Sequence, residues 1–243
     1  MVRDSYLHRK DSRMLELRQI EKSFGKKKVL RGVNMQFQHG IYGLVGLNGA
    51  GKSTLINIIT GILDADRGKV LYNGMEISNK KSAYCENLGF MPQYTTFYPE
   101  FTAKEFLKYM CVMKGIPKRE QEQKIAQMLE QVNLTEYTNE KIGSFSGGMR
   151  QRIGIAQAII NEPEILIMDE PTAGLDPSER IRFRHTLTKL ASNRTILLAT
   201  HIIPDIERMA DHVLLLHDGN IIVKKQSDEL VEELELFFSQ GGE

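Results

Sequence analysis

The stretch that decides the fold is IYGLVGLNGAGKSTLINII, residues 41–59. An apolar run comes first, the segment Gly46–Ser53 then matches the pattern G-x-x-x-x-G-K-[ST], and apolar residues at helical spacing follow. These apolar residues are Leu55, Ile56, Ile59 and Ile62. A strand, a tight loop and a helix in this order form the context in which the pattern binds phosphate. The sequence therefore predicts a phosphate-binding loop between a buried strand and a helix that begins at Gly51.

The residue types in this loop suit a nucleotide. Glycines let the backbone curl until successive N–H groups converge on phosphate oxygens, and the following helix directs its positive end at them. We expect Lys52 to reach the outer phosphates and the Ser53 hydroxyl to ligate a Mg²⁺ ion that bridges the same oxygens. The other nucleotide contacts expected in this loop are Gly46, Asn48, Gly49, Ala50, Gly51 and Thr54.

Two acidic residues end a second apolar run, EILIMDEP, at residues 164–171. A continuously apolar strand is typical of a parallel sheet covered on both faces, and ligands of such sheets collect at the carboxyl ends of the strands. We expect Asp169 to hold Mg²⁺ through water and Glu170 to orient or deprotonate an attacking water. A solvated strand end is the plainer interpretation of the pair.

The stretch SFSGGMRQR, residues 144–152, has the composition of a second phosphate grip. It offers a serine, two glycines and a helical run without an acidic residue until Glu162. The loop at Gly46–Thr54 is already complete, and a bound nucleotide has one terminal phosphate. Composition and spacing leave open why the chain carries two grips.

Strands and helices alternate along the rest of the chain, which predicts an α/β fold. Helical periodicity occupies residues 102–133, another helix follows Ser146 to about Ile160, and Pro177 opens a third. A hairpin is expected to turn at residues 218–220. Further strands are predicted at LELRQI, VNMQF, KVLYNG, LGFMPQ and RTILLAT, and a short amphipathic helix at SDELVEELELFF.

Composition excludes several classes of protein. Lysine plus arginine number 32 and aspartate plus glutamate 31, so the formal charge is +1 and no global field favours nucleic acid or an anionic bilayer. The two cysteines, Cys85 and Cys111, have no metal-like spacing, which indicates reduced thiols.

The N-terminal segment has no targeting pattern. Residues 1–14 are charged and lack the apolar centre of a secretion signal, so we expect a disordered extension on a chain that stays in the cytosol. No stretch approaches the ~20 consecutive apolar residues that span a bilayer. If the protein serves a membrane, we expect another polypeptide to cross it.

Taken together, these motifs resemble the ATP-binding subunits of ATP-binding-cassette transporters, over about residues 15–235. GLNGAGKST is similar to the Walker A loop, FMPQ to the Q-loop, SFSGGMRQR to the signature motif, ILIMDEP to Walker B, AGLDP to the D-loop and ATH to the switch-histidine segment. The resemblance implies a P-loop NTPase with a mostly parallel central sheet, an N-terminal antiparallel β portion and a helical subdomain at about residues 94–160. Residues 236–243 are then expected to be a tail.

The resemblance also suggests why there are two grips. In this family two ATPase subunits meet head to tail, and the signature of one closes over the ATP bound by the other. Ser146, Gly147 and Gly148 are therefore expected to clasp the γ-phosphate held at Lys52 of a second subunit, which makes ATP the link between them. The second subunit could be the same chain or a different one.

Four further site residues follow from the same resemblance, each with a plainer interpretation. Gln93 would contact Mg²⁺ or the attacking water, unless it is a surface amide. His201 would contact the γ-phosphate, unless it is a core histidine. Asp176 would lie at the subunit interface, although it also suits a helix N-cap before Pro177. Phe24 would stack on adenine, where the family usually has tyrosine, unless it packs in the core.

Departures from the family's usual pattern occur in the signature. Phe145 and Met149 replace the commoner leucine and glutamine, which puts in doubt one polar contact near the ribose or the partner surface. The serine and the two glycines are unchanged.

The expected function is that of an ATP hydrolase that energises a separate integral membrane permease from the cytoplasmic face of the cell membrane, with export favoured over import. Aromatic residues after Gln93, in TTFYPEF, are candidates for docking the permease or for plain core packing. The alternative is a soluble cassette ATPase of translation or DNA repair, although such proteins usually carry two cassettes or long insertions. A P-loop kinase or GTPase is disfavoured because there is no N-K-x-D motif. We expect no nucleic-acid partner.

Overall fold

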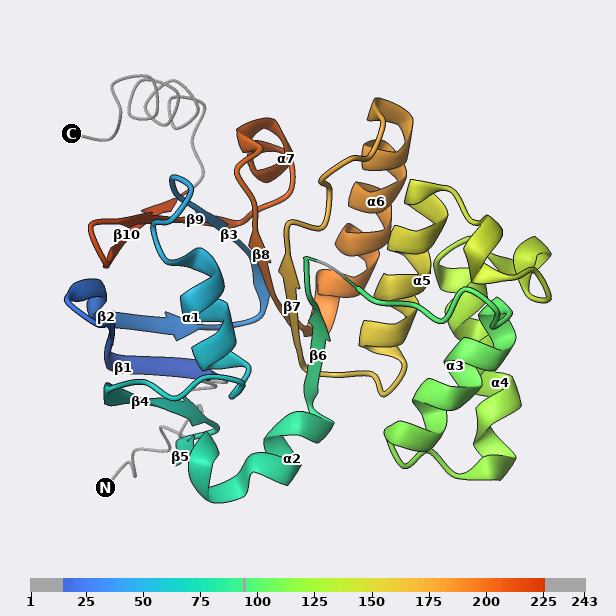
Figure 1. Cartoon of the computed structure of the whole chain (residues 1–243), viewed down its shortest axis with the longest axis horizontal. Helices are drawn as coiled ribbons and strands as arrows, with labels where there is room; N and C mark the ends of the chain where they lie inside the picture. The colour runs from blue at the N-terminus through green and yellow to red at the C-terminus, as the bar shows by residue number, and fades with distance from the viewer. Residues whose placement is uncertain (1–14, 94, 226–243) are drawn as a thin grey trace, which may run out of the picture.

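The computed structural model describes residues 15–93 and 95–225, which form two sheets with helices around them (Figure 1). The strands are β1 (Leu15–Phe24), β2 (Lys27–Phe37), β3 (Gly40–Val45), β4 (Arg67–Tyr72), β5 (Met75–Glu76), β6 (Leu88–Met91), β7 (Ile165–Asp169), β8 (Thr195–Ala199), β9 (His212–His217) and β10 (Asn220–Lys225). The α-helices are α1 (Lys52–Ile59), α2 (Lys81–Glu86), α3 (Ala103–Met113), α4 (Lys118–Gln131), α5 (Gly147–Ile159), α6 (Pro177–Leu190) and α7 (Ile203–Glu207). Four short 3₁₀ segments, η1 (Ile77–Lys80), η2 (Thr135–Tyr137), η3 (Ile142–Ser144) and η4 (Ala191–Asn193), complete the described elements.

The larger sheet has the strand order β10-β9-β3-β8-β7-β6. All neighbouring pairs from β9 to β6 are parallel, and β10 returns antiparallel to β9 through the expected hairpin at residues 218–220. The carboxyl ends of β3 and β7 therefore point to the same edge of the sheet, with β8 between them. This topology brings the loop after Val45 near the acidic residues that end β7.

Both faces of the larger sheet are buried, as the apolar run in β7 predicts. Ile165 and Ile167 belong to the core shared with α1, whereas Leu166 and Met168 belong to the core shared with α5 and α6. Side chains alternate between faces along a strand, so a strand between two cores must be apolar at every position.

The smaller sheet is antiparallel, in the order β2-β1-β4-β5, and lies at the end of the molecule away from α3 and α4 (Figure 1). Helix α1 fills the space between the two sheets, with Leu55, Ile56 and Ile59 buried there. The α/β fold with a mostly parallel central sheet and an N-terminal antiparallel portion is confirmed.

Helices α3, α4 and α5 follow β6 and precede β7, and they pack together at the opposite end of the chain's fold (Figure 1). Thr102 and Glu105 form a reciprocal capping box at the start of α3. Ile125, Met128 and Leu129 of α4 are buried on one face, as their spacing predicts.

The prediction that the helix after the loop also carries Ile62 is wrong. The helix ends at Ile59, and the Ile62 side chain is 65% exposed. Gly61 has φ +72°, its N–H donates to the Ile58 carbonyl, and the N–H of Ile62 donates to the Asn57 carbonyl. This is the Schellman arrangement that a glycine after the last helical turn favours.

Some expectations lie outside the described residues. They are the N-terminal extension at residues 1–14, the amphipathic helix SDELVEELELFF and the tail at 236–243, together with Tyr94, the aromatic residue between Gln93 and TTFYPEF. Within residues 15–93 and 95–225, none of the helices combines the length and the apolar character that a membrane crossing requires.

Candidate nucleotide-binding site

The loop between β3 and α1 has the conformation that its glycines allow. Gly51 has φ +108°, and a Cβ atom there would lie 2.8 Å from Cγ1 of Val29. Both the left-handed backbone and the close approach require glycine. Because α1 begins at Lys52 immediately afterwards, the free N–H groups of its first turn face the loop.

Lys52 is buried at this junction. Its ammonium donates hydrogen bonds to the carbonyls of Gly46 at 2.7 Å and Leu47 at 3.4 Å. Burial lowers the pKa of Lys52, while the carboxylates of Glu170 and Asp169 act in the opposite direction. The lysine of the loop and the two acidic residues after β7 therefore form one electrostatic group.

Asp169 is the last residue of β7 and has an 8% exposed surface. Burial raises the pKa of its carboxyl group, a hydrogen bond from Ser53 and the charge of Lys52 lower it, and Glu170 raises it further. A buried carboxylate beside a serine hydroxyl is a pair of hard oxygen donors, which suits Mg²⁺.

Glu170 has a backbone conformation that residues with a Cβ rarely adopt. Its φ is +50°, and its N–H donates to the Ala199 carbonyl of β8 at 2.8 Å. Strained residues held in place by neighbouring structure are concentrated at functional sites. The Glu170 carboxylate lies 2.9 Å from Nδ1 of His201, which follows β8, and the His201 side chain is 57% exposed.

One pocket of about 390 Å³ joins these groups. It is lined by Phe24, Lys27, Val29, Asn48, Gly49, Gly51, Lys52, Ser53, Thr54, Gln93, Asp169 and Glu170. Residues predicted from motifs as far apart as Phe24 and Glu170 are thus brought together. The Phe24 side chain is 52% exposed, so it is not a core residue, and its ring lies 5.8 Å from Nζ of Lys22.

Two lining residues, Lys27 and Val29, are absent from the prediction. The hairpin that joins β1 to β2 pairs Phe24 with Lys27, which places both near the pocket. The signal available in the sequence is the basic run at residues 26–28, which follows Phe24 and Gly25.

Apart from the three residues of the second grip, four predicted residues do not line this pocket. Gly46 shapes the loop, since a Cβ atom there would lie 2.7 Å from the Leu216 carbonyl oxygen, and Ala50 packs against the core beside α1. His201 reaches the site through Glu170. Asp176 is the N-cap of α6, where it accepts hydrogen bonds from the Glu179 N–H and the Ser178 hydroxyl, and the former lowers its pKa most.

The second grip also lies away from the pocket. Ser146 is the N-cap of α5 and accepts a hydrogen bond from the Met149 N–H at 3.2 Å. Ser146, Gly147 and Gly148 are all missing from the pocket lining. Phe145 is buried, and Met149 packs against the core, so both departures from the family pattern serve packing in this chain.

The two glycines of the second grip have different surroundings. A Cβ atom on Gly148 would lie 2.5 Å from Cδ of Glu179, the third residue of α6. A Cβ atom on Gly147 would meet nothing within 4 Å, and its φ is not in the left-handed range. Glycine costs helix stability relative to alanine, yet nothing in the described part of the chain requires it at position 147.

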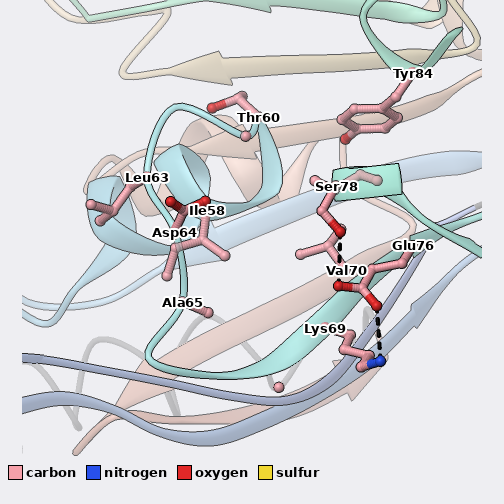
Figure 2. Close-up of a pocket in the computed structure, with 13 residues that line it drawn as sticks. Ile58, Thr60, Leu63, Asp64, Ala65, Lys69, Val70, Glu76, Ser78 and Tyr84 are labelled. Atoms are coloured by element: carbon pink, nitrogen blue, oxygen red, sulfur yellow. Dashed lines mark hydrogen bonds and ion pairs between the residues drawn. The ribbon is translucent and has the colours of Figure 1, made fainter. Parts of the chain in front are cut away.

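A second cavity, of about 160 Å³, lies below the C-terminal end of α1 (Figure 2). The Glu76 carboxylate there accepts a hydrogen bond from the Ser78 hydroxyl at 2.8 Å and forms an ion pair with Lys69 at 2.9 Å. The Tyr84 hydroxyl donates a hydrogen bond to the Ile59 carbonyl. These polar groups bind within the chain, whereas the larger pocket is lined by residues of the phosphate-binding loop and by Asp169 and Glu170.

Comparisons with known proteins agree with this geometry. Residues 30–173 match the family described as ABC transporter. The chain is 34% identical over 229 residues to the lantibiotic transport ATP-binding protein SrtF of Streptococcus pyogenes, covering 93% of this chain and 97% of SrtF. It is 34% identical over 235 residues to the Nod factor export ATP-binding protein I of Rhizobium etli, covering 93% of this chain and 73% of that protein.

A solved structure shares the fold. The ADP conformation of MJ1267, an ATP-binding cassette of an ABC transporter, superposes with a TM-score of 0.82 at 27% identity, covering 95% of this chain and 99% of the other.

Proposed function

The chain belongs to the ATP-binding proteins of the ABC transporter family, and from that membership we propose that it hydrolyses ATP at a site shared between two subunits and thereby drives a separate membrane permease. ATP binding and hydrolysis are the activity of the family. The division of the site, the Mg²⁺ ion, the residue roles and the permease are the proposed part.

The observation that carries the proposal is the pair of unequal grips. The Walker A loop lines a pocket together with Asp169 and Glu170, whereas Ser146 and Gly147 are exposed and outside it. An open glycine at a helix N-terminus lets an anion approach the backbone closely. Because a Cβ atom on Gly147 would meet nothing within 4 Å among the described residues, the turn has room there for the phosphate of a nucleotide bound to a second subunit.

Each residue in the pocket then has a chemical task. The Walker A amides and Lys52 bind the β- and γ-phosphates, and Phe24 offers a ring face to the adenine. Glu170 accepts a proton from the water that attacks the γ-phosphorus, as the bond to the β–γ bridging oxygen breaks to give ADP and phosphate. His201, 2.9 Å from Glu170, holds that carboxylate in position.

Ser53, Asp169 and Gln93 are the residues that would hold Mg²⁺. They offer hydroxyl, carboxylate and amide oxygens, all three line the pocket, and Mg²⁺ prefers such ligands together with water and phosphate. The ion would neutralise charge that develops on the phosphate oxygens.

The direction of transport and the permease are proposed from the relatives. Their names specify lantibiotic transport and Nod factor export, so we propose that this chain serves an exporter from the cytoplasmic face of a membrane. The aromatic residues before and within α3 support a docking surface. Tyr98 is 52% exposed and Tyr109 39% exposed, and both rings contact Phe101.

The experiment measures ATP hydrolysis per subunit as a function of the concentration of the full chain. A shared site predicts that the rate per subunit rises with concentration and then saturates. Ser146→Arg should keep ATP binding and lose this hydrolysis, because the new side chain occupies the space of the partner's phosphate. Hydrolysis per subunit that is independent of concentration and unaffected by Ser146→Arg would overturn the shared site.

Ser144→Arg is the matched control. Ser144 is also exposed, two residues earlier, and its hydroxyl donates to the Lys141 carbonyl at 2.8 Å. The same added charge at that position should leave association and hydrolysis close to those of the unmodified chain.

A further inference from the structure

Arg180 connects two segments that flank the site. It lies in the first turns of α6, and its Nε donates to the Leu175 carbonyl at 3.1 Å. Its Nη1 lies 3.6 Å from Oδ2 of Asp205 in α7. Leu175 belongs to the D-loop, and Asp205 lies four residues after His201 along the chain, so one guanidinium contacts both segments.

Asp205 is buried in a way that requires a cationic neighbour. It is 4% exposed, and its Oδ2 has no hydrogen-bond partner among the described residues. A buried carboxylate is costly unless a positive charge compensates it. The N–H of Asp205 donates to the Ile202 carbonyl at 3.1 Å, so the position of Asp205 is linked directly to the residue after His201.

We propose that Arg180 is a positioning residue for ATP hydrolysis, which holds the D-loop and the His201 segment in fixed relation to each other. The inference rests on the proposed function, since His201 acts there by holding Glu170. Through Asp205 and the first turn of α7, Arg180 sets where the imidazole stands; through Leu175, it sets where the D-loop and Asp176 stand.

The geometry favours arginine at this position. A guanidinium offers several N–H donors in a rigid plane and can bind a carbonyl and a carboxylate at once, whereas a lysine offers a point charge on a flexible stem. A lysine in place of Arg180 could reach one acceptor and would leave the other without its partner. The connection between the two segments therefore depends on the planar arrangement of the guanidinium N–H donors and not on positive charge alone.

The same groove contains a matched control. Leu175, Pro177, Ile181 and Pro204 line it together with Arg180, Arg184, Asp205 and Arg208. Arg184 lies one helical turn after Arg180 and carries the same charge, but no hydrogen bond or ion pair joins its guanidinium to the D-loop or to α7 among the described residues. Replacing Arg184 therefore changes the charge of the groove and leaves the contacts of Arg180 with Leu175 and Asp205 in place.

The experiment compares Arg180→Met, Arg180→Lys and Arg184→Met in the full chain, by steady-state ATP hydrolysis and by the affinity for ATP. We expect Arg180→Met to lower kcat by about 10- to 100-fold with KM within about twofold, because misplaced catalytic groups lose rate more than binding. Arg180→Lys should recover part of kcat, and Arg184→Met should keep it within about twofold.

Asp205→Asn tests the other end of the link. If the link acts as one unit, Asp205→Asn should lower kcat, and adding it to Arg180→Met should cost less than the product of the two single losses. Thermal unfolding of every variant identifies those that are merely unstable, and Asp205→Asn provides the isosteric alternative if Arg180→Met does not fold.

The outcomes separate the two proposals. Equal kcat in Arg180→Met and Arg184→Met, in folded chains that hydrolyse ATP, would overturn the role of Arg180 and leave the proposed function standing. A KM that rises with kcat unchanged would also overturn it. Failure of the unmodified chain to hydrolyse ATP at any concentration would count against the proposed function instead.

Discussion

The Walker A loop (Gly46–Ser53) and the signature turn (Ser146–Met149) contain the same chemical parts in different surroundings. Each places glycine and a serine hydroxyl at the start of a helix, where free N–H groups attract anions. The first opens into a pocket with Lys52, Asp169 and Glu170, while the second lies outside that pocket, and the Glu179 carboxylate beside it lies against Gly148 and not Gly147. The difference teaches that a phosphate grip becomes a catalytic site only where acidic and basic groups from other strands converge on it.

The same contrast extends to the glycines. Gly51 is required by its own chain, through its φ of +108° and its contact with Val29, and Gly148 by its contact with Glu179. At position 147, neither a left-handed backbone nor a close contact requires glycine. A residue whose type costs stability without an internal reason points to a ligand from outside the chain, which agrees with a signature turn completed by a second subunit.

The largest expected effect comes from disabling the catalytic side of the Walker A pocket. Glu170→Gln removes the proton acceptor and keeps the size of the side chain, so we expect kcat to fall by about 10³-fold while ATP binding remains. Because the phosphate that both grips hold is then not released, ATP should convert the chain into a stable dimer. Single-turnover hydrolysis and size-exclusion chromatography with light scattering measure the two effects.

Hydrolysis by Glu170→Gln at more than about a tenth of the normal rate would show that another group accepts the proton. Glu164→Gln, at the start of the same apolar run, is the control for a charge change away from the pocket, since Glu164 contacts Tyr72 instead. It should hydrolyse ATP normally.

The next largest effect is expected from alanine substitutions at the two glycines of the signature turn. Gly147→Ala fills open space and should leave the free energy of unfolding unchanged or slightly higher, while ATP-driven association weakens. Gly148→Ala forces the Glu179 carboxylate away from its contact with Arg152, and should unfold more easily than Gly147→Ala by about 1–2 kcal/mol. Urea unfolding measures the free energy of unfolding of each variant. ATP-driven dimerisation of each variant, combined with Glu170→Gln, measures association.

A second substitution identifies the cause of the expected loss in Gly148→Ala. If Glu179 is the obstacle, Glu179→Ala in the same chain should recover stability, and the double variant should deviate from additivity. If Gly147→Ala associates on ATP binding as well as the unmodified chain does, this would contradict the proposal that a phosphate from a second subunit approaches Gly147.

Much of this contrast is predictable from sequence, because local chemistry determines it. The apolar run of β7, the capping of α6 by Asp176 and the glycine loop before α1 all depend on neighbours in the chain, and all are present as predicted. The end of α1 at Ile59 was also predictable, since Thr60-Gly61 favours a helix stop, but the apolar spacing suggested one more turn.

The rest depends on contacts that periodicity does not encode. The order of strands in the larger sheet decides that Asp169 lies beside Lys52, and pairing between distant strands leaves no local pattern. The left-handed backbone of Glu170 depends on its hydrogen bond to Ala199 in the next strand of the chain, and Arg180 gains its importance only from α7. Separation of the two grips likewise follows from the placement of α5 and not from its sequence.

The smallest expected effect concerns the adenine side of the Walker A pocket. Phe24 is exposed at the end of β1 and lines the pocket, where its ring can stack on a base, so Phe24→Ala should weaken ATP binding by about 0.5–1.5 kcal/mol, or roughly 3- to 10-fold in Kd. Phe24→Tyr keeps the ring and should bind as the unmodified chain does. Titration with ATP and with inorganic triphosphate separates the base from the phosphates: the loss should occur for ATP and not for triphosphate, and an equal loss for both would mean that Phe24 supports the loop instead of the adenine.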